Sequence, residues 1–295
     1  MSGRAVVLGG GGSAGNAWLI GVVAGLADAG MDVTGADLMV GTSAGATAAA
    51  QLCGESPTRL LAGILGAAPP PPVASTASGG GRARGAPAVN HLERTGRIIA
   101  AAADPADMRR RLGASALALD AGSEGSWSAR WRAAVAARLP SGRWPERPLL
   151  VTAVDARTGE PVVFDRHSGV DLVDAVAAST SGGGTAYRIG EGRYIDGGYR
   201  SNAENADLAA GYGRVLVLSP LSGRSLHPEE WGTHLATQVD ELRAAGSRVE
   251  TVFPDSGAAH LFGENAMDPS LRAPAARAGY QQGAALAEQL AEFWR

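Results

Sequence analysis

The sequence contains no lysine, and all 26 of its basic residues are arginines. Several chemistries need a lysine amine: a Schiff base with pyridoxal phosphate, the phosphate contact of a Walker-type nucleotide site, and a serine–lysine catalytic pair. Its absence excludes these mechanisms before any motif is considered.

Cysteine and aromatic residues are also scarce. Cys53 is the only cysteine, so the chain can form no internal disulfide and no thiolate cluster around a metal. Aromatic residues make up 5% of the chain, which does not favour a surface on which nucleic-acid bases could stack. The net charge of -3 gives no indication of a positively charged surface for the phosphates of nucleic acid. We therefore expect no nucleic-acid partner, no metal and no cofactor.

Long apolar runs are missing too, since none approaches the ~18 residues typical of a membrane-spanning helix. The first predicted strand begins by about Ala5, which leaves no room for a leader peptide ahead of it. These features predict a cytoplasmic protein, and peripheral contact with a membrane surface stays open.

The composition, 45% hydrophobic and 19% charged, is typical of a globular protein, and we expect residues 1–295 to form a single domain. One stretch, at about residues 67–88, is instead rich in proline, glycine and serine. Such a segment cannot bury enough apolar surface to offset the entropy lost on ordering, so it is predicted to be a flexible insertion. Its role as a lid or as a plain spacer is left open.

What the sequence does contain is two glycine-framed turns near its start, each between a strand-like and a helix-like run. Residues 5–8 lead into the glycine-rich residues 9–15, and residues 37–40 lead into residues 41–45. The second turn has the pattern G-x-S-x-G, in which the flanking glycines allow a sharp bend and expose the serine at the head of a helix. Ser43 is therefore a candidate nucleophile.

The first turn supplies backbone amides without side chains in the way. The amides of Gly10, Gly11 and Gly12 suit an anion or a developing oxyanion. The same stretch also fits the dinucleotide fingerprint G-x-G-x-x-G, which ends at Gly15. A dinucleotide-binding protein is thus an alternative, with Asp32 or Asp37 as the partner of the ribose.

A third piece places a carboxylate, Asp196, in front of Gly197 and Gly198. Together the three pieces resemble the patatin-like phospholipase family of serine acyl hydrolases, over residues 6 to about 220. The resemblance implies a fold with a mostly parallel central sheet flanked by helices, and hydrolysis of the carboxylic esters of lipids. It also implies that Ser43 is the nucleophile and that Asp196 is its sole partner in a catalytic dyad.

The oxyanion hole implied by this resemblance comprises the amides of Gly10, Gly11, Gly12 and Ala44. The framing glycines of the motifs are Gly15, Gly41, Gly45, Gly197 and Gly198. The chain departs from the family pattern in two places: Ala14 stands where a cation is usual, and residues 182–184 are three glycines. These departures leave a catalytically silent lipid-binding relative as a further alternative.

Other residues could in principle assist Ser43. Asp155 ends a predicted strand, but the residues after it are typical of a hairpin turn. A histidine triad is disfavoured because the elbow follows the second strand, earlier than in an α/β-hydrolase. The histidines are His91, His167, His227, His234 and His260. Strands and helices alternate along the chain, which independently predicts an α/β fold with a mostly parallel sheet.

Overall fold

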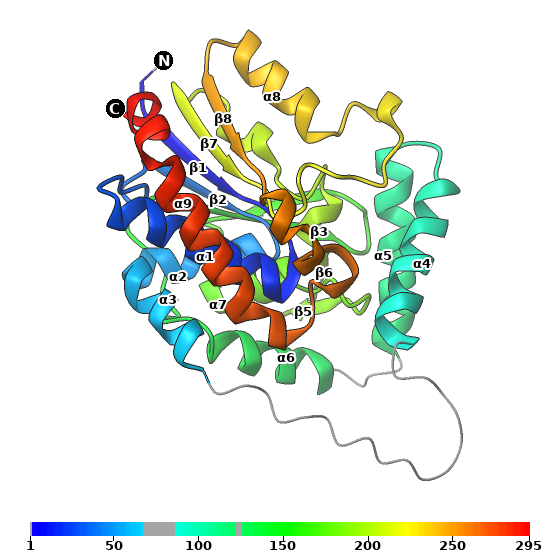
Figure 1. The fold of residues 1–295 in the computed structure, drawn as a ribbon. Helices are drawn as coiled ribbons and strands as arrows, with labels where there is room; N and C mark the ends of the chain where they lie inside the picture. The colour runs from blue at the N-terminus through cyan, green and yellow to red at the C-terminus, as the bar shows by residue number, and fades with distance from the viewer. Residues whose placement is uncertain (1, 68–85, 122–125) are drawn as a thin grey trace.

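Apolar runs of the sequence form one eight-stranded sheet in the computed structural model, which describes residues 2–67, 86–121 and 126–295 (Figure 1). The strands are β1 (Arg4–Leu8), β2 (Leu38–Gly41), β3 (Leu149–Asp155), β4 (Pro161–Phe164), β5 (Tyr187–Ile189), β6 (Gly192–Asp196), β7 (Arg214–Leu218) and β8 (Arg248–Val252). Their order is β5-β6-β3-β2-β1-β7-β8, with β4 also paired to β3. Strands β3, β2, β1, β7 and β8 are parallel, and β4, β5 and β6 pair in antiparallel fashion.

Helices lie against this sheet. They are α1 (Gly12–Asp28), α2 (Ala44–Gly54), α3 (Pro57–Gly66), α4 (Ala86–Ala100), α5 (Pro105–Ala121), α6 (Ser126–Ala136), α7 (Leu172–Ser179), α8 (Leu235–Ala244) and α9 (Arg272–Trp294). The predicted α/β fold, a mostly parallel sheet flanked by helices, is confirmed. None of the described helices is long and apolar enough to cross a membrane.

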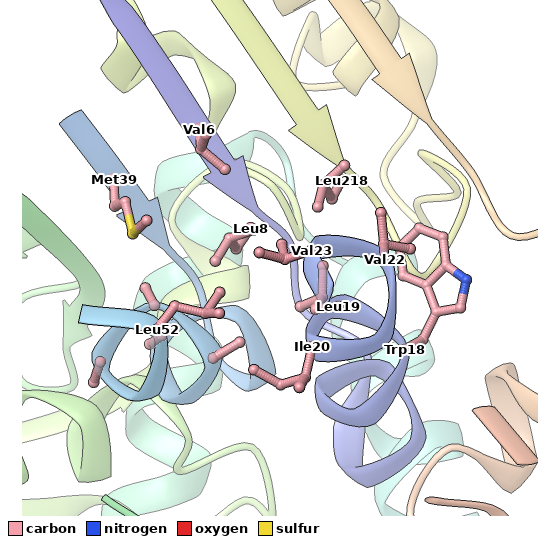
Figure 2. Packing of buried hydrophobic residues seen from close by; sticks show 14 of the residues in the cluster. Val6, Leu8, Trp18, Leu19, Ile20, Val22, Val23, Met39, Leu52 and Leu218 are labelled. Carbon is pink, nitrogen blue, oxygen red and sulfur yellow. The ribbon is translucent and has the colours of Figure 1, made fainter. Parts of the chain in front are cut away.

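The central strands β1, β2 and β7 are apolar except for the arginines that begin β1 and β7, as expected of strands with both faces buried. In β1, Val6 and Leu8 belong to the core on the side of α1, α2, α7 and α9, whereas Ala5 and Val7 belong to the core under α8. Figure 2 shows Val6 and Leu8 directed toward the side chains of α1 and α2. The centre of the sheet is therefore covered on both sides.

Helix α1 is enclosed on almost every side, as the apolar run of residues 17–26 predicts. Trp18 is fully buried, and its Nε1 donates to Oε1 of Gln282 on α9 at 3.2 Å. Helix α9 runs closely alongside α1 (Figure 1). Glycines at their contact let the two backbones approach, because a Cβ there would overlap the backbone of the other helix; they are Gly21, Gly25, Gly279 and Gly283.

The antiparallel hairpin of β3 and β4 agrees with the hairpin turn predicted after Asp155. The insertion predicted at about residues 67–88 lies mostly outside the described residues. Residues 86–88 of this stretch belong to α4.

Candidate active site

Ser43 lies at the turn between β2 and α2, where the G-x-S-x-G motif predicted an elbow. Its backbone has φ 52° and ψ -116°, a conformation that residues with a side chain rarely adopt. Such strain persists only when the surrounding structure imposes it, and it is typical of nucleophile elbows. The turn raises the Ser43 side chain at the carboxyl edge of the parallel strands.

The glycines around Ser43 are required by close packing. A Cβ on Gly45 would overlap the carbonyl oxygen of Leu8, so α2 begins directly against the end of β1. A Cβ on Gly41 would lie 2.6 Å from Cα of Ala46, inside the first turn of α2. The motif therefore sets both the bend at Ser43 and the distance between the elbow and β1.

Asp196 is the last residue of β6 and leads into the short 3-10 helix η1 (Gly197–Tyr199). The hydroxyl of Ser43 donates to Oδ2 of Asp196 at 2.8 Å. The amide of Gly198 donates to Oδ1 of the same carboxylate, also at 2.8 Å. The two residues that the sequence motifs single out, 153 positions apart, are thus in direct contact.

The Asp196 side chain is buried, with 8% of the residue exposed. Burial raises the pKa of Asp196 from 3.8 to about 6, and the hydrogen bonds from Gly198 and Ser43 only partly oppose this rise. A carboxylate with a pKa close to neutral is a stronger base than an ordinary aspartate, and it is still ionised at neutral pH. The site therefore holds a serine next to a carboxylate with enhanced basicity.

The glycine loop lies beside the serine. A Cβ on Gly10 would be 3.5 Å from Cβ of Ser43, an ordinary van der Waals distance. Gly12 has φ 64°, and a Cβ there would lie 2.8 Å from the carbonyl oxygen of Ala266. The amide of Gly15 donates to the carbonyl oxygen of Gly11 at 2.9 Å, and this hydrogen bond forms the first turn of α1.

The Gly10 amide is one predicted oxyanion donor that is already occupied. It donates to the carbonyl oxygen of Ala203 at 2.8 Å, so it is not free to donate to a bound oxyanion in this conformation. By contrast, the amides of Gly11, Gly12 and Ala44 have no hydrogen-bond acceptor in the described part of the chain. Free amides of this kind, at helix N-termini, suit a developing negative charge.

Two further residues of the site had no signal in the sequence. Oγ of Ser179, at the end of α7, accepts the Ser43 amide at 2.9 Å, which removes that amide from the set of free donors. The side chain of Asn205 is completely buried and donates to Thr42 and to the Gly197 carbonyl oxygen, each at 3.0 Å. Both contacts depend on the tertiary fold, and no local pattern around Ser179 or Asn205 indicates them.

The alternative partners for Ser43 lie elsewhere. Oδ1 of Asp155 accepts the amides of Arg157 and Thr158 in the turn of the β3–β4 hairpin, as its sequence context predicted. None of the five histidine rings, all of which are described, hydrogen-bonds with Ser43 or Asp196. Among the residues that the structure describes, Asp196 is the ionisable side chain to which the Ser43 hydroxyl donates a hydrogen bond.

The dinucleotide alternative requires an acid at the carboxyl end of β2. Asp32 and Asp37 instead precede β2, which starts at Leu38 and runs parallel to β1. Both aspartates therefore lie toward the amino ends of these strands, whereas dinucleotides bind outside the carboxyl ends. Oδ2 of Asp37 also accepts the amide of Arg4. This arrangement does not provide the ribose contact of a dinucleotide site.

Among the residues that the structure describes, no group of three or more histidine, cysteine, aspartate and glutamate side chains is placed to hold a metal ion. Cys53 is partly buried, and burial raises the pKa of its thiol to about 11. It is therefore a protonated, unreactive thiol at neutral pH.

No protein-family model and no curated protein sequence matches this chain. Among solved structures, the chain is similar to the crystal structure of type III effector protein ExoU, with 17% sequence identity and a TM-score of 0.40. The similarity covers 98% of this chain and 53% of the ExoU chain, so the chain spans about half of the length of that protein.

Proposed function

We propose that this protein is a serine acyl hydrolase of the patatin-like type, in which Ser43 is the nucleophile and Asp196 is its only ionisable partner. The observation that carries the proposal is the 2.8 Å hydrogen bond from Oγ of Ser43 to Oδ2 of Asp196 at a strained strand-to-helix turn. The free amides of Gly11, Gly12 and Ala44 support it, because acyl transfer needs donors for the oxyanion.

In this mechanism the Asp196 carboxylate accepts the Ser43 proton as Oγ attacks the carbonyl carbon of an ester. The amides of Gly11, Gly12 and Ala44 hold the negative oxygen of the tetrahedral intermediate. When the intermediate collapses, the carbon–oxygen bond to the alcohol breaks, and Asp196 returns its proton to the departing alkoxide. Asp196 next takes a proton from water, which attacks the acyl-serine, and the acid is released as Ser43 regains its proton.

The lipid nature of the ester rests on the resemblance of the motifs. We propose a carboxylic ester of a phospholipid or lysophospholipid, hydrolysed in the cytoplasm during peripheral contact with a membrane surface. Beside the glycine loop, Met267 is 64% exposed, and its sulfur would lie 2.9 Å from a Cβ added to Gly12.

Labelling with a fluorophosphonate probe tests the proposal directly. The probe forms a covalent bond only with an activated serine, so peptide mass spectrometry should find the label on Ser43 and on no other residue. Ser43→Ala should abolish labelling and provides the control. A label on another serine would contradict the assignment. No label, with binding of NAD, would favour the dinucleotide alternative, and no label without NAD binding would favour the silent relative.

The pH dependence of hydrolysis should follow the ionisation of Asp196. Only the carboxylate can accept a proton, and burial raises the pKa of Asp196 to about 6. We therefore expect kcat/KM to fall about tenfold for each unit of pH below about 6 and to level off above it. The measurement is the acid released from a neutral short-chain ester over that range. A profile that keeps its plateau down to about pH 4, the ordinary pKa of an aspartate, would contradict the role of Asp196.

A further inference from the structure

One buried side-chain amide contacts the residue before Ser43 and the residue after Asp196. Nδ2 of Asn205 donates to Oγ1 of Thr42, the residue before Ser43, at 3.0 Å. The same nitrogen donates to the carbonyl oxygen of Gly197, the residue after Asp196, at 3.0 Å. Strand β3 separates β2 from β6 in the sheet, so these two turns are not neighbours through strand pairing.

The orientation of the Asn205 amide is fixed by its partners. Its Oδ1 accepts from Nη1 of Arg200 at 3.1 Å, and a guanidinium group can only donate. The Arg200 guanidinium is itself held by Asp207 through hydrogen bonds of 2.9 and 2.8 Å. Since the Gly197 carbonyl oxygen can only accept, Nδ2 of Asn205 must face Gly197 and Thr42.

The backbone of Asn205 is suited to asparagine. It has φ 56° and ψ 45°, the left-handed region that asparagine tolerates better than most residues with a side chain. The backbone amide of Asn205 donates to Oδ1 of Asn202 at 2.7 Å, and this hydrogen bond holds the turn. The side chain is completely buried, so it competes with no water for its partners.

Thr152 of β3 completes the connection between the two turns. Its Oγ1 donates to Oγ1 of Thr42 at 3.0 Å, and Thr42 Oγ1 in turn faces the carbonyl oxygen of Glu204 at 3.4 Å. A Cβ on Gly197 would overlap Oγ1 of Thr152, so the turn after Asp196 packs directly on this hydroxyl. The side-chain polar atoms of Thr42, Thr152 and Asn205 therefore each have a partner, as a buried polar network requires.

We propose that Asn205 is a positioning residue of the proposed hydrolase: by holding Thr42 and Gly197 with one amide nitrogen, it sets the distance between the Ser43 hydroxyl and the Asp196 carboxylate. This inference rests on the proposed function for its effect on rate. The Asn205 side chain hydrogen-bonds with neither Ser43 nor Asp196, and it acts through the Thr42 hydroxyl and the Gly197 carbonyl group next to them. Its loss changes the alignment of the reacting groups, not the groups themselves.

The test replaces Asn205 with glycine, which accepts the left-handed backbone but has no amide side chain. We expect kcat for a neutral ester to fall about 10- to 100-fold with little change in KM, because a small misplacement of a catalytic group has a cost of this order. The rate of fluorophosphonate labelling at Ser43 should fall in parallel. Asn205→Asp, which keeps the contact with Arg200 but presents a carboxylate oxygen to the Gly197 carbonyl oxygen, should also lower both rates.

A pair of variants at Thr152 provides the matched control and does not depend on the folding of Asn205 variants. Thr152→Val removes the hydroxyl with little change of shape, and Thr152→Ser keeps the hydroxyl. The loss of kcat should be clearly larger for valine than for serine. Equal losses for the two, or an Asn205→Gly protein that folds and keeps the kcat and labelling rate of the unaltered protein, would overturn the proposal.

Crystal structures of the unaltered protein and of Asn205→Gly separate this inference from the proposed function. If Asn205 positions the pair, the Ser43–Asp196 hydrogen bond should lengthen beyond hydrogen-bond distance in the variant. If the 2.8 Å contact and the place of Gly197 are unchanged, the inference is wrong whatever the activity. If the unaltered protein takes no label at Ser43, the proposed function fails, and the two structures still decide the positioning role.

Discussion

Replacing Asp196 with asparagine is expected to reduce ester hydrolysis at neutral pH by about 10⁴-fold or more, the order of loss seen when one member of a catalytic unit is removed. Asparagine keeps the size of the side chain, and its Oδ1 can still accept the Gly198 amide. What it loses is the ability to take the proton of the Ser43 hydroxyl. Ser43→Ala should lower hydrolysis at least as far.

The same substitution should make the fold more stable at neutral pH. Burial raises the pKa of Asp196 from 3.8 to about 6, so the charged form is less favourable in the folded state than in the unfolded state. The protonated form of Asp196 favours the folded state. This contribution to stability is complete below the pKa of the unfolded state, 3.8, and is lost as the pH rises through the folded pKa of about 6. Asp196→Asn should thus raise the free energy of unfolding by up to about 3 kcal/mol above pH 6, and by little near pH 4.

The measurements are hydrolysis of a neutral ester and denaturant unfolding at the two pH values. Asp155→Asn is the matched control for the other candidate acid and should change hydrolysis little. Full hydrolysis by Asp196→Asn, together with its loss in a histidine variant, would overturn the dyad and restore a histidine triad. Lower stability of Asp196→Asn above pH 6 would contradict the physical account of the raised pKa.

Gly45→Ala should destabilise the protein by about 3 kcal/mol or more, at the upper end of the cost of overpacking a core. The added methyl group would overlap the carbonyl oxygen of Leu8, and its other near neighbours are also backbone atoms of β1 and the glycine loop. Neither side can move aside by rotating a side chain. Helix α2 must therefore shift away from β1, and the Ser43 turn must shift with it.

Gly63→Ala is the matched control for this prediction. Gly63 lies in the exposed part of α3, and a Cβ there would meet no atom within 4 Å. Alanine is a better helix former than glycine by roughly 0.5–1 kcal/mol, so this variant should be slightly more stable than the unaltered protein. Thermal unfolding should place the Tm of Gly45→Ala well below, and that of Gly63→Ala at or above, the unaltered value. Equal Tm values for the two variants would show that the close approach at Gly45 does not constrain the fold.

Those parts of the fold that depend on local pattern were predictable from the sequence. The apolar run of residues 5–8 and the glycines after it predicted a strand, a turn and a buried helix, which are β1 and α1. The glycines around Ser43 predicted the elbow, because only a few residues allow so sharp a bend. The hairpin of β3 and β4 followed from its turn residues in the same way.

The remaining features depend on pairings between distant segments. Nothing near Gly10 indicates that its amide donates to Ala203, and this contact removes Gly10 from the predicted set of free donors. The antiparallel placement of β6 beside β3 is likewise a matter of tertiary packing, although it is what brings Asp196 toward Ser43. Ser179 and Asn205 were missed for the same reason, since each acts on a turn more than a hundred positions away along the chain.

The close packing of α9 on α1 has a consequence for the folding of the chain during its synthesis on the ribosome. The glycine loop leads straight into α1, and α1 acquires its cover only when residues 272–294 have been made. Strand β1 similarly waits for β7 to flank it. Until residues 272–294 have been made, the Ser43 turn of an emerging chain would therefore rest on an incompletely packed scaffold.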